Sequence, residues 1–169
     1  MLELASSISS ALADSVVREW TLWLLMNVPG FPPIVQSVHI LAVCAVVASA
    51  VMLNLRLVGI AVPGQLPAEM SRRLQPWWIS ALGVLFVTGM VFVIARPDRY
   101  FFNPVAGIKL AAACTGIVLT IFVFRLARTI LSGAKPGAGL RVLAVVSSAC
   151  WILVILSGRW IAYVDYLFY

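Results

Sequence analysis

Long runs of apolar residues, interrupted by short polar segments, dominate the chain. Four of these runs are long enough to cross a bilayer as helices, which takes roughly 20 apolar residues each. We expect the four spans at 34–62, 76–95, 104–132 and 140–167. The connecting segments are short and rich in Pro, Gly and charged residues, which favours antiparallel neighbours. The pattern predicts an all-α membrane protein, a four-transmembrane-helix up-down bundle over residues 31–169.

Residues 1–30 have a different pattern, in which apolar and charged positions alternate at helical spacing. Leu12, Val16 and Trp20 share one stripe, whereas Asp14 and Arg18 share another. The segment is too short and too charged to span a bilayer. It suits an amphipathic helix in the membrane interface, with its tryptophans at the level of the headgroups. We therefore predict an N-terminal amphipathic interfacial helix, followed by a proline-rich turn.

Helical spacing also indicates which faces of the spans turn inward. In the third span Lys109, Gly116 and Thr120 share a face of mostly small residues, and bulky residues lie opposite. Small residues at helix contacts and bulky residues toward lipid are typical of membrane bundles. In the fourth span, a stripe that runs over 148–163 and includes Arg159 predicts a comparable face. We expect both Lys109 and Arg159 to point into the bundle.

Composition and charge support a membrane location and suggest an orientation. The chain is 63% hydrophobic and 11% charged, with a mean hydropathy of +1.06, whereas soluble domains are about half apolar and about a quarter charged. The net charge of +6 gathers on one side of the predicted bundle, where a single Glu69 accompanies seven basic residues: Arg56, Arg72, Arg73, Arg125, Arg128, Lys135 and Arg141. By the positive-inside rule, we expect a bacterial inner membrane protein with both termini in the periplasm. No nucleic acid partner is expected, because the arginines are accounted for as membrane anchors.

A small set of functional side chains falls near the outer ends of the spans. His39, the single histidine, and Lys109 each lie about five residues inside a span, roughly 8 Å deep at 1.5 Å per residue. Met90 approaches the same level from the second span, and Arg159 from the fourth. Ionisable groups within spans are costly and usually mark a site or a pathway. The coincidence in depth therefore predicts a shared site.

A b haem would suit a site made of these residues. Neutral imidazole is a standard axial ligand, so His39 is the candidate metal ligand. The sixth position would belong to Met90, to Lys109, to a histidine of a neighbouring copy, or to no residue. Arginines near the interface can pair with the propionates. The candidate cofactor-binding residues are His39, Met90, Lys109, Arg96, Arg99 and Arg159. The structural alternative is a histidine that only hydrogen-bonds a neighbouring helix.

Four stretches carry a resemblance to known families: "VHILAVCAVVASAVMLNLRL", "MSRRLQPWWISALGVLFVTGMVFVIA", "NPVAGIKLAAACTGIVLTIFVFRLAR" and "SGRWIAYV". They resemble an uncharacterised family of small bacterial four-helix membrane proteins. That family is similar to CopD-like copper-handling domains and, more distantly, to HemJ-type protoporphyrinogen oxidases. The HemJ-type resemblance implies a b haem with His39, the Arg72–Arg73 pair and Lys109 at the matching positions.

The CopD-like resemblance implies a different chemistry, the passage of copper. Its candidate ligands would be His39, Cys44, Met90 and Cys114. The three cysteines of the chain lie in separate spans, so they predict neither a disulfide framework nor a zinc site.

The residues and the resemblance together favour a b-type haem or redox subunit. We expect it to relay electrons near the outer face, or to anchor a redox partner such as a quinone or a periplasmic redox protein. One alternative is a copper-handling membrane protein, and another is a structural or lipid-binding scaffold without a cofactor. Membrane lipids are expected partners. The small-residue faces also permit a homo-oligomer or a place in a larger membrane complex, and the sequence leaves enzymatic activity open.

Overall fold

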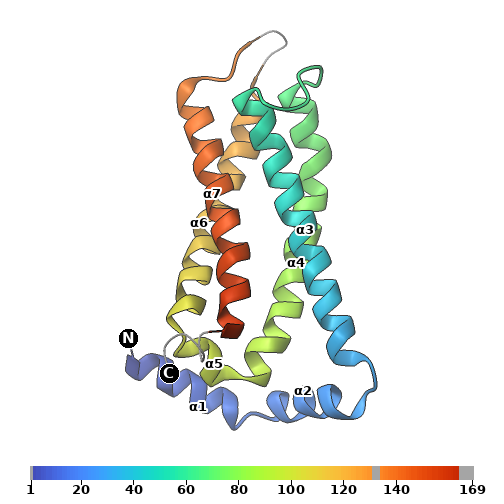
Figure 1. The fold of residues 1–169 in the computed structure, drawn as a ribbon, viewed down its shortest axis with the longest axis vertical. Helices are drawn as coiled ribbons and strands as arrows, with labels where there is room; N and C mark the ends of the chain where they lie inside the picture. The colour runs from blue at the N-terminus through green and yellow to red at the C-terminus, as the bar shows by residue number, and fades with distance from the viewer. Residues whose placement is uncertain (1, 131–133, 164–169) are drawn as a thin grey trace.

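Four long helices form a bundle in the computed structural model, which describes residues 2–130 and 134–163, with the backbone alone at 2–5 and 162. They are α3 (Phe31–Val58), α4 (Pro67–Ala95), α6 (Pro104–Ala127) and α7 (Ala138–Trp160), and they stand side by side (Figure 1). A short 3-10 helix, η1 (Ile161–Tyr163), follows α7. Each long helix is apolar and long enough to cross a membrane. The predicted all-α four-helix bundle is confirmed.

The helices do not begin and end where the apolar runs do. α3 starts before its apolar run, because the prolines at 32 and 33 occupy the first turn, where a missing N–H costs little. α4 starts at Pro67, so that Pro76, the expected start, lies inside the helix. The first turns of α4 are polar, so they precede the apolar run on which the prediction was based. α6 ends at Ala127, earlier than predicted, and residues 164–167 of the last predicted span lie outside the described residues.

The N-terminal segment forms two helices, α1 (Leu2–Ala13) and α2 (Val16–Asn27), so the prediction of one helix was wrong in number. The break falls at Ser15, whose hydroxyl oxygen accepts a hydrogen bond from the backbone N–H of Arg18. A serine in this position starts a new helix by satisfying one of its free N–H groups. Together with α5 (Pro97–Phe101), the two helices lie across one end of the bundle (Figure 1). We call α1, α2 and α5 the platform.

One hydrogen bond ties α1 to the rest of the platform. The buried Ser9 hydroxyl donates to a carboxylate oxygen of Asp98 in α5, at 2.6 Å. We expect Asp98→Ala to weaken the docking of α1 by about 1 kcal/mol, because a hydrogen bond to a charged group is lost. Backbone amides of residues 6–13 should then exchange with deuterium several times faster. Asp14→Ala is the matched control, and equal exchange in the two variants would contradict the prediction.

α3 is the central helix of the bundle. It packs most extensively with α4 and next with α7, whereas α6 packs mainly with α7. The main core of buried apolar side chains begins at Val46 on α3 and continues to Leu57. This core therefore lies away from the platform, toward the end where α3 and α6 stop.

Three side-chain hydrogen bonds connect the hairpin α3–α4 to the hairpin α6–α7 among the described residues. They join Asn54 to Ser148 at 2.9 Å, Ser71 to the carbonyl of Phe124 at 2.9 Å, and Arg128 to Gln75. All three lie in the half of the bundle that is remote from the platform. The hairpins are thus joined most firmly at that end.

The inward faces were predicted correctly for α6 and wrongly for α7. Gly116 and Thr120 are buried in α6, and bulky residues such as Phe122 are exposed. In α7 the buried residues are Ala144, Ser147, Trp151, Val154 and Ser157. Arg159 is exposed instead. The error has a physical reason, because a membrane helix carries isoleucines toward lipid as readily as toward the core, so bulk alone does not identify its inner face.

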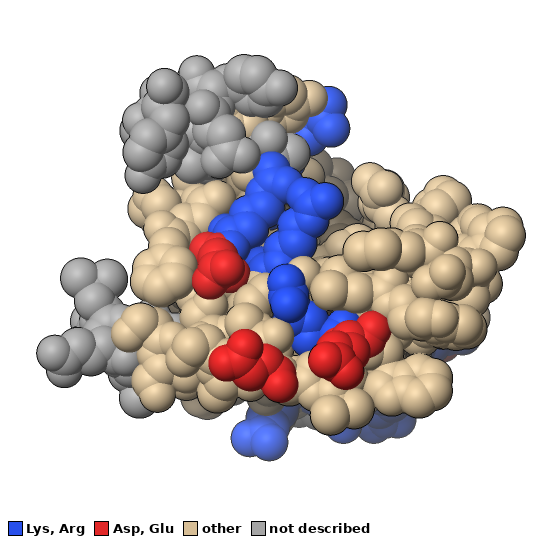
Figure 2. Space-filling model, turned by 90° about the horizontal axis from the view of Figure 1, so that it is seen from below, with Lys and Arg blue, Asp and Glu red and all other residues tan. Residues whose placement is uncertain are grey.

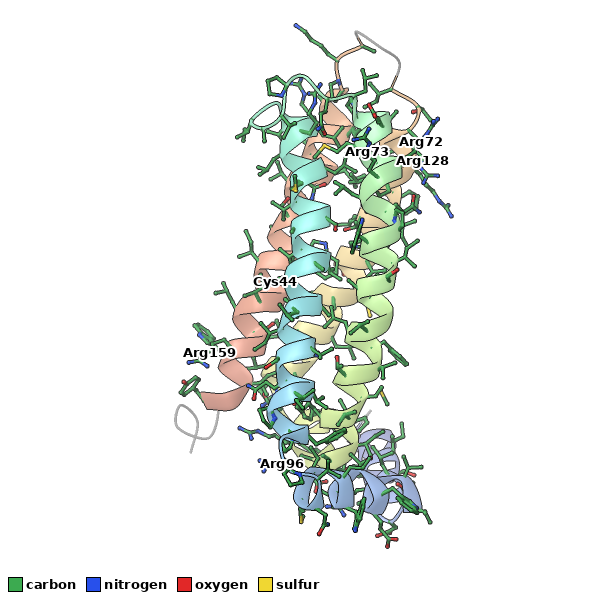
Figure 3. The ribbon with its side chains drawn as sticks, turned by 90° about the vertical axis from the view of Figure 1, so that its right-hand side faces the viewer. Cys44, Arg72, Arg73, Arg96, Arg128 and Arg159 are labelled. Atoms are coloured by element: carbon green, nitrogen blue, oxygen red, sulfur yellow. The ribbon has the colours of Figure 1, made fainter. Side chains whose placement is uncertain are left out.

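Arginines lie near both ends of the bundle. Arg72, Arg73 and Arg128 lie at one end, and Arg96 and Arg159 lie toward the platform (Figure 3). We call the first end, where α3 and α6 stop and α4 and α7 begin, the basic end. The other is the platform end.

Candidate functional site

His39 is held against α4 by three neighbours at the platform end. Its Nδ1 lies 2.8 Å from the hydroxyl oxygen of Thr88. Its ring meets Phe92 edge-on, with the ring centroids 5.6 Å apart. A Cβ atom at Gly89 would lie 3.6 Å from Cε1 of the imidazole. This is an ordinary contact distance, so the imidazole lies directly beside the α4 backbone at Gly89.

The hydrogen bonds around Thr88 favour one neutral tautomer of His39. The Thr88 hydroxyl donates to the carbonyl of Val84 at 2.7 Å, a bond that threonine commonly makes inside helices. Its lone pairs remain to accept an N–H from His39, so the arrangement favours the neutral tautomer with the proton on Nδ1 and the lone pair on Nε2. Nε2 makes no hydrogen bond with the described residues. Metal-ligating histidines are commonly oriented in this way, with one N–H fixed by an acceptor.

Lys109 crosses from α6 to α7. Its Nζ lies 3.3 Å from the position that a Cβ would occupy at Gly158, so the missing side chain leaves room for the ammonium. Lys109 is half-buried and acts electrostatically on His39. The structure therefore brings an imidazole and an ammonium into the same region, from α3 and α6.

The positions of His39 and Lys109 along the bundle can be compared because α3 and α6 both contact the same pair of adjacent serines in α7. Asn54 of α3 and Thr120 of α6 both hydrogen-bond the Ser147–Ser148 pair of α7. His39 lies fifteen residues from Asn54, about 22 Å along the helix, and Lys109 lies eleven residues from Thr120, about 16 Å. Lys109 is thus about one helical turn farther from the platform than His39.

Three arginines lie toward the platform end. Arg96 links α4 to α5 and is exposed, and Arg99 lies in α5. Burial raises the pKa of Tyr100 above its usual value, while the positive charges of Arg99 and Arg96 act in the opposite direction. The guanidinium of Arg159 lies over the ring of Tyr163, 5.1 Å from its centroid. Lys and Arg side chains gather in a hollow near the middle of this face, with acidic side chains beside them (Figure 2).

Three predicted members of the site lie elsewhere. Met90 follows Thr88 by two residues, about 200° around α4, and is 36% exposed, so it faces away from His39. Arg72 and Arg73, which the HemJ-type resemblance would group with His39, lie at the basic end (Figure 3). The structure does not bring these residues to the imidazole.

The thiols point away from a common centre. Cys44 and Cys114 are exposed, and Cys150 is intermediate. Among the residues that the structure describes, no three His, Cys, Asp or Glu side chains come together as a metal-binding group. A metal bound at His39 would therefore need ligands other than these side chains.

Sequence reasoning missed the neighbours that orient His39 and Lys109. Thr88, Gly89 and Phe92 support the imidazole, and Gly158 makes room for the ammonium. A signal for the first group existed, because a short connection between antiparallel helices places His39 opposite residues 87–89. No sequence pattern predicted the role of Gly158, because its contact with Lys109 depends on how α6 and α7 pack against each other.

These features define an integral membrane protein, a four-helix bundle with a polar site near its platform end. The chain belongs to a family of unknown function, DUF6644, which matches residues 30–164. No curated protein and no solved structure matches the chain.

Proposed function

We propose that the protein is a b-type haem subunit of the membrane that takes part in electron transfer, with His39 as an axial ligand. The observation that carries the proposal is the contact between His39 Nδ1 and the Thr88 hydroxyl, which orients the ring and leaves Nε2 without a hydrogen bond among the described residues. The fixed Nδ1–H gives the ring the orientation that a ligand needs. The resemblance to HemJ-type oxidases supports the same role for His39 and a place beside the haem for Lys109.

The basic residues of the platform end would hold the acidic groups of the cofactor. Arg96, Arg99 and Arg159 lie toward the platform end, and their guanidinium groups would form charge-assisted hydrogen bonds with propionates near the interface. Lys109 or an open position suits the sixth site better than Met90, which faces away from His39. A bound haem would supply a one-electron redox centre. The protein would orient it and shield one side of it from water.

The charge distribution supports an orientation in the membrane. We propose that the basic end faces the cytoplasm and the platform faces the periplasm of a bacterial inner membrane. Electrons would then pass between a periplasmic redox protein and the quinone pool. The amphipathic platform would lie at the level of the outer headgroups, where exposed Trp20 and Trp23 suit the interface.

Copper handling receives less support. Cu(I) favours thiolate and thioether ligands, yet Cys44, Cys114 and Met90 are exposed, and Met90 faces away from His39. A scaffold without a cofactor, which binds only lipid, is the remaining alternative.

An absorption spectrum of the purified protein tests these alternatives. Protein expressed in cells supplied with a haem precursor should show a Soret band, a sharp α band on reduction with dithionite, and about one haem per chain. The haem content would be measured as the pyridine haemochrome and the copper content by elemental analysis. Copper without haem would favour the copper-handling alternative. A chain that binds neither, even after incubation with haemin, would contradict the proposal and favour the scaffold.

A further inference from the structure

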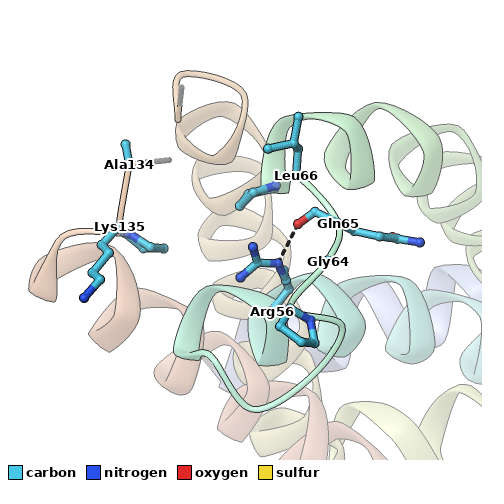
Figure 4. A pocket seen from close by; sticks show the side chains of 9 residues that line it. Arg56, Gly64, Gln65, Leu66, Ala134 and Lys135 are labelled. Atoms are coloured by element: carbon cyan, nitrogen blue, oxygen red, sulfur yellow. Dashed lines mark hydrogen bonds between the residues drawn. The ribbon is translucent and has the colours of Figure 1, made fainter. Parts of the chain in front are cut away.

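A pocket at the basic end is unrelated to the His39 site. It lies between the segment that joins α3 to α4 and the segment that precedes α7 (Figure 4). Its volume is about 320 Å³, and it is lined by Arg56 and by residues 63–67 and 134–136. Arg56 and Lys135 lie on opposite sides of it (Figure 4), and none of its lining residues is acidic. The pocket therefore favours an anion.

Arg56 is held in place on one wall of the pocket. Its Nε donates to the carbonyl of Gln65 at 2.7 Å, which fixes the guanidinium on the loop that follows α3. Its remaining N–H groups make no hydrogen bond with the described residues. A planar guanidinium with several free donors is well suited to phosphate oxygens. Arg56 is thus an oriented but unsatisfied donor.

Two helices begin beside the pocket, and neither has a side-chain cap. α4 begins at Pro67, after Leu66, and α7 begins at Ala138, after Gly137. The first N–H groups of a helix lack partners within the helix, and its dipole is positive at this end. Both helix starts therefore add to the positive potential that Arg56 and Lys135 produce. At α4 the carboxylate of Glu69, in the first turn and paired with Arg73, offsets part of this effect.

The backbone of the same loop is strained. Val62 has a φ of +48°, in the left-handed region that β-branched residues rarely adopt. It directly precedes Pro63, which lines the pocket. Such strain persists where the surrounding structure holds it, and it gathers at ligand sites. The loop is thus held in a shape that its local sequence does not favour.

We propose that this pocket binds a phosphate group. The ends of the membrane-spanning helices lie beside it, so an anionic phospholipid headgroup of the adjacent leaflet would supply that group most directly. A soluble phosphate compound has the same chemistry and would use the same donors. The proposal does not depend on a haem at His39, since the two sites lie at opposite ends of the bundle.

Native mass spectrometry of the full-length protein in detergent tests this proposal. The probes are phosphatidylglycerol, net-neutral phosphatidylcholine and inorganic phosphate. Arg56→Gln should weaken phosphatidylglycerol binding by about tenfold, because charge-assisted hydrogen bonds are lost. Lys135→Gln, in an exposed segment where folding is not at risk, should weaken it by about threefold. Arg141→Gln is the matched control, because Arg141 is exposed at the same end but does not line the pocket.

A competition experiment between phosphatidylglycerol and inorganic phosphate distinguishes the two sources of the phosphate group. Displacement of phosphatidylglycerol by millimolar inorganic phosphate would identify a site that accepts soluble phosphate. Persistence of lipid binding that depends on Arg56 and resists phosphate would identify a headgroup site. Equal binding of the two lipids would show that the pocket recognises the phosphate and not the net charge of the headgroup. The proposal is wrong if the pocket variants and the Arg141→Gln control bind phosphatidylglycerol alike.

Discussion

His39→Ala should remove the haem absorbance of the purified protein and leave the bundle folded. The Nε2 atom of the imidazole makes no hydrogen bond among the described residues, and the contact of Nδ1 with Thr88 orients the ring. It lies outside the main core, which begins at Val46, so its truncation creates no large cavity there. We expect the haem content to fall to less than about a tenth of that of the natural chain, since an axial ligand is lost. Absorbance at the Soret band and the pyridine haemochrome would measure this, with circular dichroism as the test of folding.

Two further variants distinguish ligation from a structural effect. Met90→Leu is the matched control, because Met90 faces away from His39, and it should keep its haem. Thr88→Val removes the acceptor of the Nδ1–H and keeps the shape of the side chain. Loss of a partner of this kind typically lowers affinity by about 10–100-fold. An unchanged Soret band in His39→Ala would exclude His39 as the ligand, whatever the other variants show.

Trp151→Ala should be among the most destabilising single changes in the bundle. The indole is 2% exposed, and its N–H donates to the Thr120 hydroxyl at 2.9 Å. The ring also lies against Gly116, where an added Cβ would be 3.4 Å from Cε2. Removing a buried tryptophan costs about 3–5 kcal/mol of unfolding free energy through lost packing and the cavity left behind. Unfolding in detergent micelles, followed by circular dichroism, would measure the change.

Matched substitutions separate packing from hydrogen bonding at this position. Trp151→Phe keeps most of the apolar volume and loses the N–H, so we expect a smaller cost, near 1 kcal/mol for the hydrogen bond plus some loss of packing. Trp77→Ala removes a tryptophan that is 71% exposed, and should change the free energy by about 0.5 kcal/mol or less. If Trp151→Ala were no worse than Trp77→Ala, the packing between α6 and α7 described above would be wrong.

The sequence alone predicted the number and order of the spans correctly, because a helix needs a long apolar run to cross a bilayer. It was also sufficient for the inner face of α6, where glycine and threonine contrast with bulky neighbours. The inner face of α7 was misread, because lipid accepts isoleucine as readily as a core does. The start of α4 was missed because its first turns are polar and carry no apolar signal.

The candidate site could be predicted only in part. His39 and Lys109 stood out because ionisable groups are rare in spans. Their supports, such as Thr88 and Gly158, belong to other helices and acquire meaning only through pairing across the bundle. Depth along the chain also suggested Met90, but depth carries no information about the direction of a side chain around its helix. The position of Met90 relative to Thr88 supplies that direction.

The uneven placement of the contacts between the two hairpins has a mechanical consequence. The hydrogen bonds between them and most of the packed core lie toward the basic end, whereas at the platform end the chain itself joins the hairpins, through α5 between α4 and α6. Separating the hairpins at the basic end would break the packed core, and separating them at the platform end is limited by the short connection through α5. Of the two seams between the hairpins, α4 packs less extensively against α6 than α3 packs against α7, so a flat apolar molecule in the bilayer would meet the least packing between α4 and α6.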